Sequence, residues 1–123
     1  MNTILNRFVA FMAVYFICSS LQAAQPLDII ETDIRSIHAA YKAGTLSAEE
    51  LTTAYLERIQ TYDNNGPKLN SFITLNPEAL DVARTLDKER KSKGMRGPLH
   101  GIPIVIKDNY DTKDLPTTGG SAV

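Results

Sequence analysis

Apolar side chains recur at helical spacing in residues 32–44, TDIRSIHAAYKAG. Thr32 stands where an N-cap is expected, and Gly44 follows the last apolar position, as a helix C-terminal glycine does. The pattern predicts a short amphipathic helix, and residues 24–46 are expected to form a helical N-terminal segment. Its apolar face is formed by Ile34, Ile37 and Tyr41.

The same spacing is stronger in residues 47–62, SAEELTTAYLERIQTY. Ser47 and Glu50 have the separation of a capping box, in which each residue satisfies a free backbone N–H of the other. A second amphipathic helix is therefore predicted. Its apolar stripe is formed by Leu51, Ala54, Tyr55, Ile59 and Tyr62.

A third helix is predicted to start with Asn76 as its N-cap and Pro77 in its first turn, because proline suits the first helical position. Gly94 is expected to end it. The charged residues 87–94, DKERKSKG, are most simply a solvated end of this helix. Its buried face is predicted to be formed by Leu80, Ala83 and Leu86.

Two segments have the composition of strands: residues 70–75, NSFITL, and residues 103–107, PIVIK. Pro103 suits the first position of a strand, and the apolar residues after it fall on both alternating faces, which predicts a central strand. The order helix, helix, strand, helix, strand predicts an α/β fold of which this chain holds only a part. Lys107 would then lie at the carboxyl end of a strand, where open α/β sheets place ligand-binding and catalytic groups.

The N-terminus has the outline of a secretory signal peptide. Residues 1–7 carry Arg7, residues 8–18 (FVAFMAVYFIC) are apolar, and SSLQAAQ follows with small residues suited to cleavage. Eleven apolar residues are too few to span a bilayer, so a stable membrane anchor is not expected. Residues 1–23 are predicted to be removed, and the protein to be exported to the periplasm or the medium.

Composition limits the remaining function classes. A chain that is 43% hydrophobic and 22% charged resembles one soluble globular unit. Without Arg7 there are 12 basic and 14 acidic side chains, and no basic field suggests nucleic acid as a partner. Cys18 is the single cysteine and falls in the signal segment, so no disulfide is expected. His38 and His100 are predicted to be structural, and no metal site is expected.

Lys107 ends an apolar strand without a break, which demands an explanation. In one interpretation its side chain reaches solvent and pairs with Asp108, Asp111 or Asp114. In another the strand end is buried, and burial keeps the amine neutral so that it can take the proton of a serine hydroxyl. A third makes the amine a Schiff-base former. Spacing alone leaves all three open.

Residues 97–122, GPLHGIPIVIKDNYDTKDLPTTGGSA, resemble the opening motif of the amidase signature family. Similarity to the family extends over residues 47–123, which are interpreted as the N-terminal part of an amidase domain that stops before its serine-containing part. The motif core comprises Gly101, Pro103, Ile104, Ile106, Lys107 and Asp108, and its later element comprises Thr117, Thr118, Gly120 and Ser121.

The resemblance implies helices packed on a mixed central sheet and a hydrolase of non-peptide carboxamide C–N bonds. The family uses a serine nucleophile, a second serine held by a cis peptide bond, and a lysine base, which by motif position is Lys107. Reaction would pass through an acyl-enzyme, with backbone amides stabilising the oxyanion. The resemblance implies a small-molecule amide substrate and no metal or organic cofactor; it does not predict the oligomeric state.

Both family serines belong downstream of the later element, so Ser121 is not the nucleophile by motif position. Thr117, Thr118, Gly120 and Ser121 are expected to shape the loop beside the site. Asp108 and Asn109 are expected to hold Lys107 through hydrogen bonds, although capping of a turn explains them about as well. A non-catalytic ligand-binding protein that keeps the amidase scaffold without its nucleophile is the alternative function.

Overall fold

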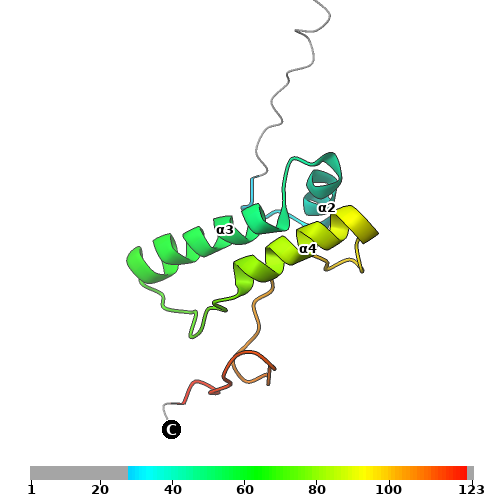
Figure 1. Ribbon diagram of the computed structural model, residues 1–123. Coiled ribbons are helices and arrows are strands. Elements are labelled where there is room, and N and C mark those ends of the chain that lie inside the picture. The colour runs from blue at the N-terminus through cyan, green and yellow to red at the C-terminus, as the bar shows by residue number, and fades with distance from the viewer. Residues whose placement is uncertain (1–27, 122–123) are drawn as a thin grey trace, which may run out of the picture.

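The computed structural model describes residues 28–121, and the predicted signal peptide therefore lies outside the described part (Figure 1). The described elements are α2 (Ile34–Ala43), α3 (Ala48–Arg58), the π-helix η2 (Ile59–Asn65) and α4 (Ala79–Lys93). Within residues 28–121, no helix combines the length and apolar character that crossing a membrane requires.

The two ends of helix α2 are set by its capping residues, Asp33 and Gly44. Its N-cap is Asp33, whose carboxylate accepts from the Ser36 N–H at 2.7 Å, so the cap lies one residue after the predicted Thr32. Gly44 ends the helix in the left-handed conformation at φ 72°, as predicted. Ile37, Ala40 and Tyr41 face the core, and Ile34 is exposed.

Helix α3 begins with the predicted capping box. The Ser47 hydroxyl accepts from the Glu50 N–H at 3.1 Å, and the Glu50 carboxylate accepts from the Ser47 N–H at 2.8 Å. The helix continues directly into η2, which ends before Gly66. A Cβ at Gly66 would lie 2.8 Å from the Thr61 carbonyl oxygen, so a side chain there would force the backbone to move.

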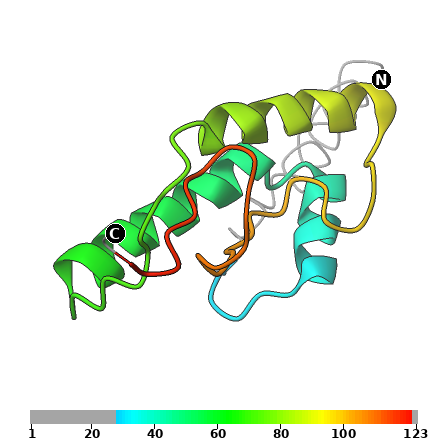
Figure 2. The ribbon, with the colours of Figure 1, turned by 90° about the horizontal axis from the view of Figure 1, so that it is seen from below.

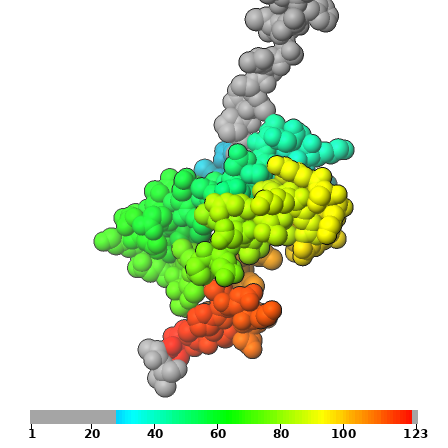
Figure 3. All heavy atoms as spheres, in the orientation of Figure 1, coloured from blue at the N-terminus to red at the C-terminus, as the bar shows by residue number. Residues whose placement is uncertain are grey.

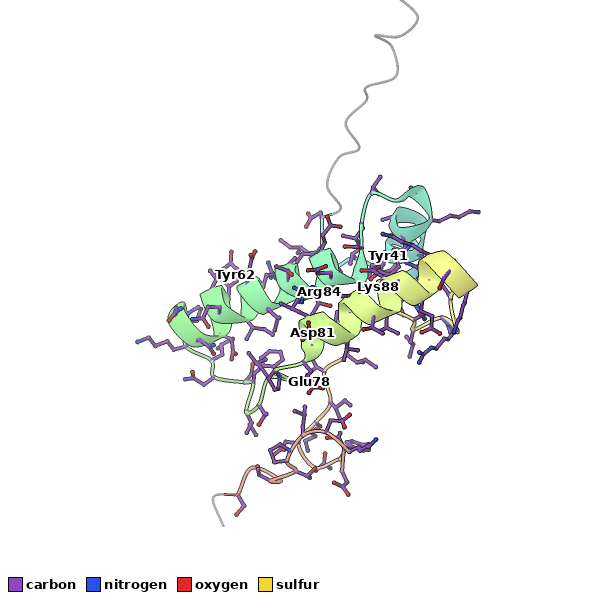
Figure 4. The ribbon with its side chains drawn as sticks, viewed as in Figure 1. Tyr41, Tyr62, Glu78, Asp81, Arg84 and Lys88 are labelled. Atoms are coloured by element: carbon purple, nitrogen blue, oxygen red, sulfur yellow. The ribbon has the colours of Figure 1, made fainter. Side chains whose placement is uncertain are left out.

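Helix α4 lies beside α3 with the opposite chain direction (Figures 1 and 2). It begins at Ala79, and the predicted cap Asn76 instead accepts from the Glu78 N–H in a turn just before the helix. Gly94 follows its last residue at φ 84°. Arg84, labelled in Figure 4, lies on the exposed side of α4, and its guanidinium is 2.8 Å from the Glu49 carboxylate of α3.

The core lies where α2, α3 and α4 meet. Leu51 has no exposed surface, and Tyr55 and Ile102 pack against the edge of the buried cluster. This arrangement confirms Ile37 and Tyr41 of the apolar face predicted for α2 and the first half of the stripe predicted for α3, whereas Ile34 is exposed and Tyr62 at the far end is 54% exposed. The buried cluster is formed by Ile37, Tyr41, Ala48, Leu51 and Ala83.

The predicted mixed central sheet is wrong for the described chain, which is helical and contains no strand between residues 28 and 121. A strand needs a neighbour with which its backbone can pair, and residues 103–107 have no such partner within the described chain. Val105 is accordingly 73% exposed. In residues 70–75, the N–H groups of Ser71 and Phe72 donate to the Asp63 carboxylate instead of to a neighbouring strand.

Candidate functional site

The segment that carries Lys107 leaves the helical unit at a fixed point, Gly101. The buried Tyr41 hydroxyl donates to the Gly101 carbonyl oxygen at 2.7 Å. Gly101 has φ +75°, and a Cβ there would lie 3.0 Å from the Ala48 Cβ, so this close approach requires glycine. The chain after residue 101 therefore starts from a defined position on the core.

His100 strengthens this anchor. Its ring is buried, with Nε2 2.9 Å from the Leu86 carbonyl oxygen and Nδ1 accepting from the Arg96 N–H at 3.3 Å. Because a carbonyl can only accept, Nε2 carries the proton and Nδ1 is free to accept, which is the neutral tautomer. His100 thus joins the middle of α4 to the loop that precedes the Lys107 segment.

The ion pair between Asp87 and Arg90 supports the same junction. Asp87 is buried, so the prediction that residues 87–94 are a solvated face is wrong at its first residue. The Asp87 carboxylate accepts from the N–H groups of Ala48 (3.0 Å) and Glu49 (3.1 Å) and from Arg90 (2.9 Å). Arg90 also donates to the Tyr41 carbonyl at 2.8 Å and lies 4.8 Å from the centre of the Tyr41 ring.

Burial opposes ionisation of Asp87, but the hydrogen bonds from Arg90, Ala48 and Glu49 outweigh it, so the pKa of Asp87 is lowered. The burial of Asp87 could have been predicted from the sequence. Leu80, Ala83 and Asp87 stand at i, i+3 and i+7, which places the carboxylate in line with the apolar stripe of α4 rather than in solvent.

A groove of about 1070 Å³ lies between the α3–η2 helix and the segment after Gly101. Lys107, Asp108 and Asn109 line one part of it. Its wall is largely apolar and includes Tyr55, Ile59, Phe72, Leu75, Ile104 and Ile106. Figure 3 shows the C-terminal segment projecting from the helical body.

Lys107 is exposed in the described structure. Between residues 28 and 121, no ion pair joins its side chain to Asp108, Asp111 or Asp114, so the pairing considered for it is not formed. Its backbone is held, because the Lys107 carbonyl oxygen accepts from the Tyr110 N–H at 3.0 Å.

The Asp108 carboxylate binds the later element of the motif. Its carboxylate accepts from the N–H groups of Thr118 and Gly120, each at 3.1 Å, and from the Thr118 hydroxyl. These bonds lower the pKa of Asp108, with the largest effect from the Thr118 hydroxyl and the next from the Thr118 N–H. The structure thus brings together two parts of the motif that are ten residues apart.

The other predicted residues complete the loop. The Thr117 hydroxyl donates to the Tyr110 carbonyl oxygen at 3.1 Å, and the Ser121 N–H donates to the Thr118 carbonyl oxygen at 3.0 Å. Asn109 is exposed at the groove. These bonds join Thr117, Thr118, Gly120 and Ser121 into a loop that follows Lys107, and their expected role beside a catalytic site stays a prediction.

Comparison with known proteins decides the family. The amidase family model matches residues 50–123, which include Lys107 and the loop after it. The chain belongs to the amidase family. It is 40% identical over 98 residues to a glutamyl-tRNA(Gln) amidotransferase subunit from Salinispora arenicola, covering 75% of this chain and 19% of that protein.

Two further relatives agree. The corresponding glutamyl-tRNA(Gln) amidotransferase protein of Chloroflexus aggregans is 43% identical over 91 residues, covering 73% of this amidase-family chain and 18% of that protein. The crystal structure of the peptide amidase from Stenotrophomonas maltophilia superposes with a TM-score of 0.72 at 46% identity, over 75% of this chain and 19% of that chain. The chain thus spans less than a fifth of the length of these relatives.

Proposed function

We propose that the protein containing this chain hydrolyses a carboxamide C–N bond through a serine acyl-enzyme, with Lys107 as the general base. The observation that carries the proposal is the position of Lys107: it lies inside the family match, at the end of GIPIVIK, and lines the groove next to a loop closed by Asp108.

In the proposed mechanism, the neutral Lys107 amine accepts the proton of a serine hydroxyl while the serine oxygen attacks the amide carbonyl carbon. The C–N bond then breaks, the nitrogen leaves with the proton from Lys107, and water releases the acid from the acyl-enzyme. The nucleophile is a serine that the family places downstream of the Thr117–Ser121 element. Since Lys107 is exposed here, the neutral amine requires cover from that part of the protein.

The substrate is proposed to be a small carboxamide, with a peptide amide as the first compound to test because a peptide amidase is 46% identical to this chain. Export by residues 1–23 is proposed from their sequence alone and would place the reaction outside the cytoplasm. The alternative is a non-catalytic binding protein on the same scaffold. Labelling with a serine-directed fluorophosphonate distinguishes the two, because only an enzyme with a reactive serine would be labelled.

The test is Lys107→Met in the full-length protein, with Lys113→Met as a matched control in the same loop. We expect Lys107→Met to lower kcat by about 10²- to 10⁴-fold, the usual contribution of a general base, and Lys113→Met to leave kcat unchanged. Ammonia release from a peptide amide gives the rate, and circular dichroism checks folding. Full turnover by a folded Lys107→Met protein would overturn the assignment of the base.

A further inference from the structure

The contacts of Asp108 show how it can act on Lys107 without a hydrogen bond to the Lys107 side chain. Asp108 follows Lys107 directly, yet both of its carboxylate oxygens accept hydrogen bonds from residues ten and twelve positions later. Its own carbonyl oxygen accepts a further bond from the Gly119 N–H at 3.0 Å. One residue therefore fixes the Thr118–Gly120 turn with its side chain and its backbone together.

The loop that Asp108 closes has little other support. Ile104, Val105 and Ile106, which lead into it, are more than half exposed. The loop is held mainly by its own hydrogen bonds, such as those from the Tyr110 N–H to the Lys107 carbonyl and from the Thr117 hydroxyl to the Tyr110 carbonyl. A loop with so few packing contacts keeps its shape through such bonds, and loss of the Asp108 carboxylate would remove three of them at once.

We propose that Asp108 is a positioning residue: its carboxylate ties Thr118 and Gly120 to the backbone next to Lys107 and thereby fixes the Lys107 amine relative to the chain that follows the loop. The proposal rests on the proposed function, in which that amine must meet a serine hydroxyl. Asp108 itself needs no contact with substrate. A displacement of about 1 Å between base and nucleophile can lower turnover by about 100-fold.

The charge of Asp108 suits this role. Its lowered pKa keeps the carboxylate ionised at neutral pH, so both oxygens act as acceptors. Asparagine has nearly the same shape, but its amide nitrogen is a donor and would face the N–H of either Thr118 or Gly120. Asp108→Asn therefore disturbs the turn with almost no change in volume.

Four variants of the full-length protein test the proposal. Asp108→Asn removes an acceptor, Thr118→Val removes the hydroxyl donor, and Thr118→Ser restores that donor. Asp114→Asn removes the same charge from the same loop and is the matched control, since Asp114 forms no hydrogen bond with another described residue. Each variant is assayed for kcat and KM with a peptide amide, and thermal unfolding is measured in parallel.

We expect Asp108→Asn to lower kcat by about 10- to 100-fold with KM changed less than about twofold, because a misplaced amine impairs the proton transfer more than it impairs substrate binding. Thr118→Val is expected to lower kcat in the same way, and Thr118→Ser to restore most of it. Asp114→Asn should match the wild type.

Three results would overturn the proposal: a folded Asp108→Asn protein with wild-type kcat, a loss in which KM rises as much as kcat falls, or Thr118→Ser as slow as Thr118→Val. The pair at Thr118 decides the question even where Asp108→Asn fails to fold. Lys107→Met separates the two proposals. Full activity of Lys107→Met refutes the assignment of Lys107 as the general base. An inactive Lys107→Met together with a fully active Asp108→Asn refutes only the positioning role of Asp108.

Discussion

The helical unit and the segment after Gly101 are stabilised in different ways. In the helical unit, Leu51 is completely buried, and the Asp87–Arg90 pair joins α4 to the start of α3 and to α2. In residues 102–121, by contrast, Val105 is 73% exposed, and hydrogen bonds within the loop hold its shape. The candidate catalytic residue lies in the second region, at the groove between the two.

The buried helical core and the segment that carries the candidate catalytic residue Lys107 are therefore separate parts of the chain. Gly101 is the joint: its carbonyl oxygen accepts from the buried Tyr41 hydroxyl, and its missing Cβ lets it approach Ala48. Before this joint, the core side chains of Ile37, Tyr41 and Leu51 are buried among the helices. After it, Ile104 and Ile106 line an open groove, so the shape of the site depends on Asp108 and its bonds more than on packing.

The strongest test of the comparison is removal of the buried carboxylate. Asp87→Ala leaves Arg90 and two N–H groups of α3 without their partner, and we expect a loss of about 3–5 kcal/mol in the free energy of unfolding. Asp81→Ala is the matched control, because Asp81 also pairs with an arginine three residues later but is 78% exposed. Its effect should be much smaller. Urea denaturation of both variants checks this; equal losses would contradict it.

The pH dependence of stability sharpens the same prediction. The pKa of Asp87 is lowered in the folded protein, so its contribution to stability is present above its ordinary pKa near 3.8. That contribution is lost as the pH falls through the lowered value. Asp87→Asn should therefore weaken the loss of stability below about pH 4 while leaving the curve near neutral pH flat. An unchanged acid limb would show that other carboxylates control it.

Much of the helical unit was predictable from sequence, because its signals are local. Ser47 and Glu50 predicted a helix start that the structure shows, and Gly44 predicted a helix end. The sheet was not predicted correctly, since pairing depends on a neighbour and apolar composition alone does not supply one. Residues 103–107 have the composition of a buried strand but are exposed in the described chain.

The candidate site shows the same limit. Family resemblance marked Lys107 and the Thr117–Ser121 element, and the hydrogen bonds of the Thr117–Ser121 element form a loop beside Lys107, whose role at a site stays a prediction. For Asp108 the sequence left two roles open, a hydrogen bond to Lys107 or capping of a turn, and the observed bonds to Thr118 and Gly120 are of the second kind. The Asp108 carboxylate meets Thr118 and Gly120 across ten and twelve residues, a contact that sequence spacing does not encode.

A smaller effect is expected at the joint itself. Tyr41→Phe keeps the ring under the Arg90 guanidinium and removes only the hydroxyl that donates to Gly101, which should cost about 1–2 kcal/mol. Burial, and next the Asp87 charge, raise the pKa of Tyr41 to about 12, so this donor is intact at all ordinary pH values.

Tyr55→Phe is the control for this variant, because its longer 3.4 Å bond to the Ile29 carbonyl should contribute less. Amide hydrogen exchange at Ile102 provides a local readout, and faster exchange there is expected only in Tyr41→Phe. Equal exchange in the two variants would mean that the hydroxyl does not anchor the segment.

The smallest effect on stability is expected after the joint. Val105→Lys in the 123-residue chain replaces a side chain that is 73% exposed, so the free energy of unfolding should change by less than about 0.5 kcal/mol. Self-association should fall, because the added charge interrupts the apolar surface formed with Ile104 and Ile106. Val82→Lys adds the same charge at an exposed site on α4 and should leave self-association unchanged. Sedimentation velocity and urea denaturation distinguish the outcomes: a loss above about 1 kcal/mol in Val105→Lys would show that Val105 is covered, and the contrast between the two regions would then disappear.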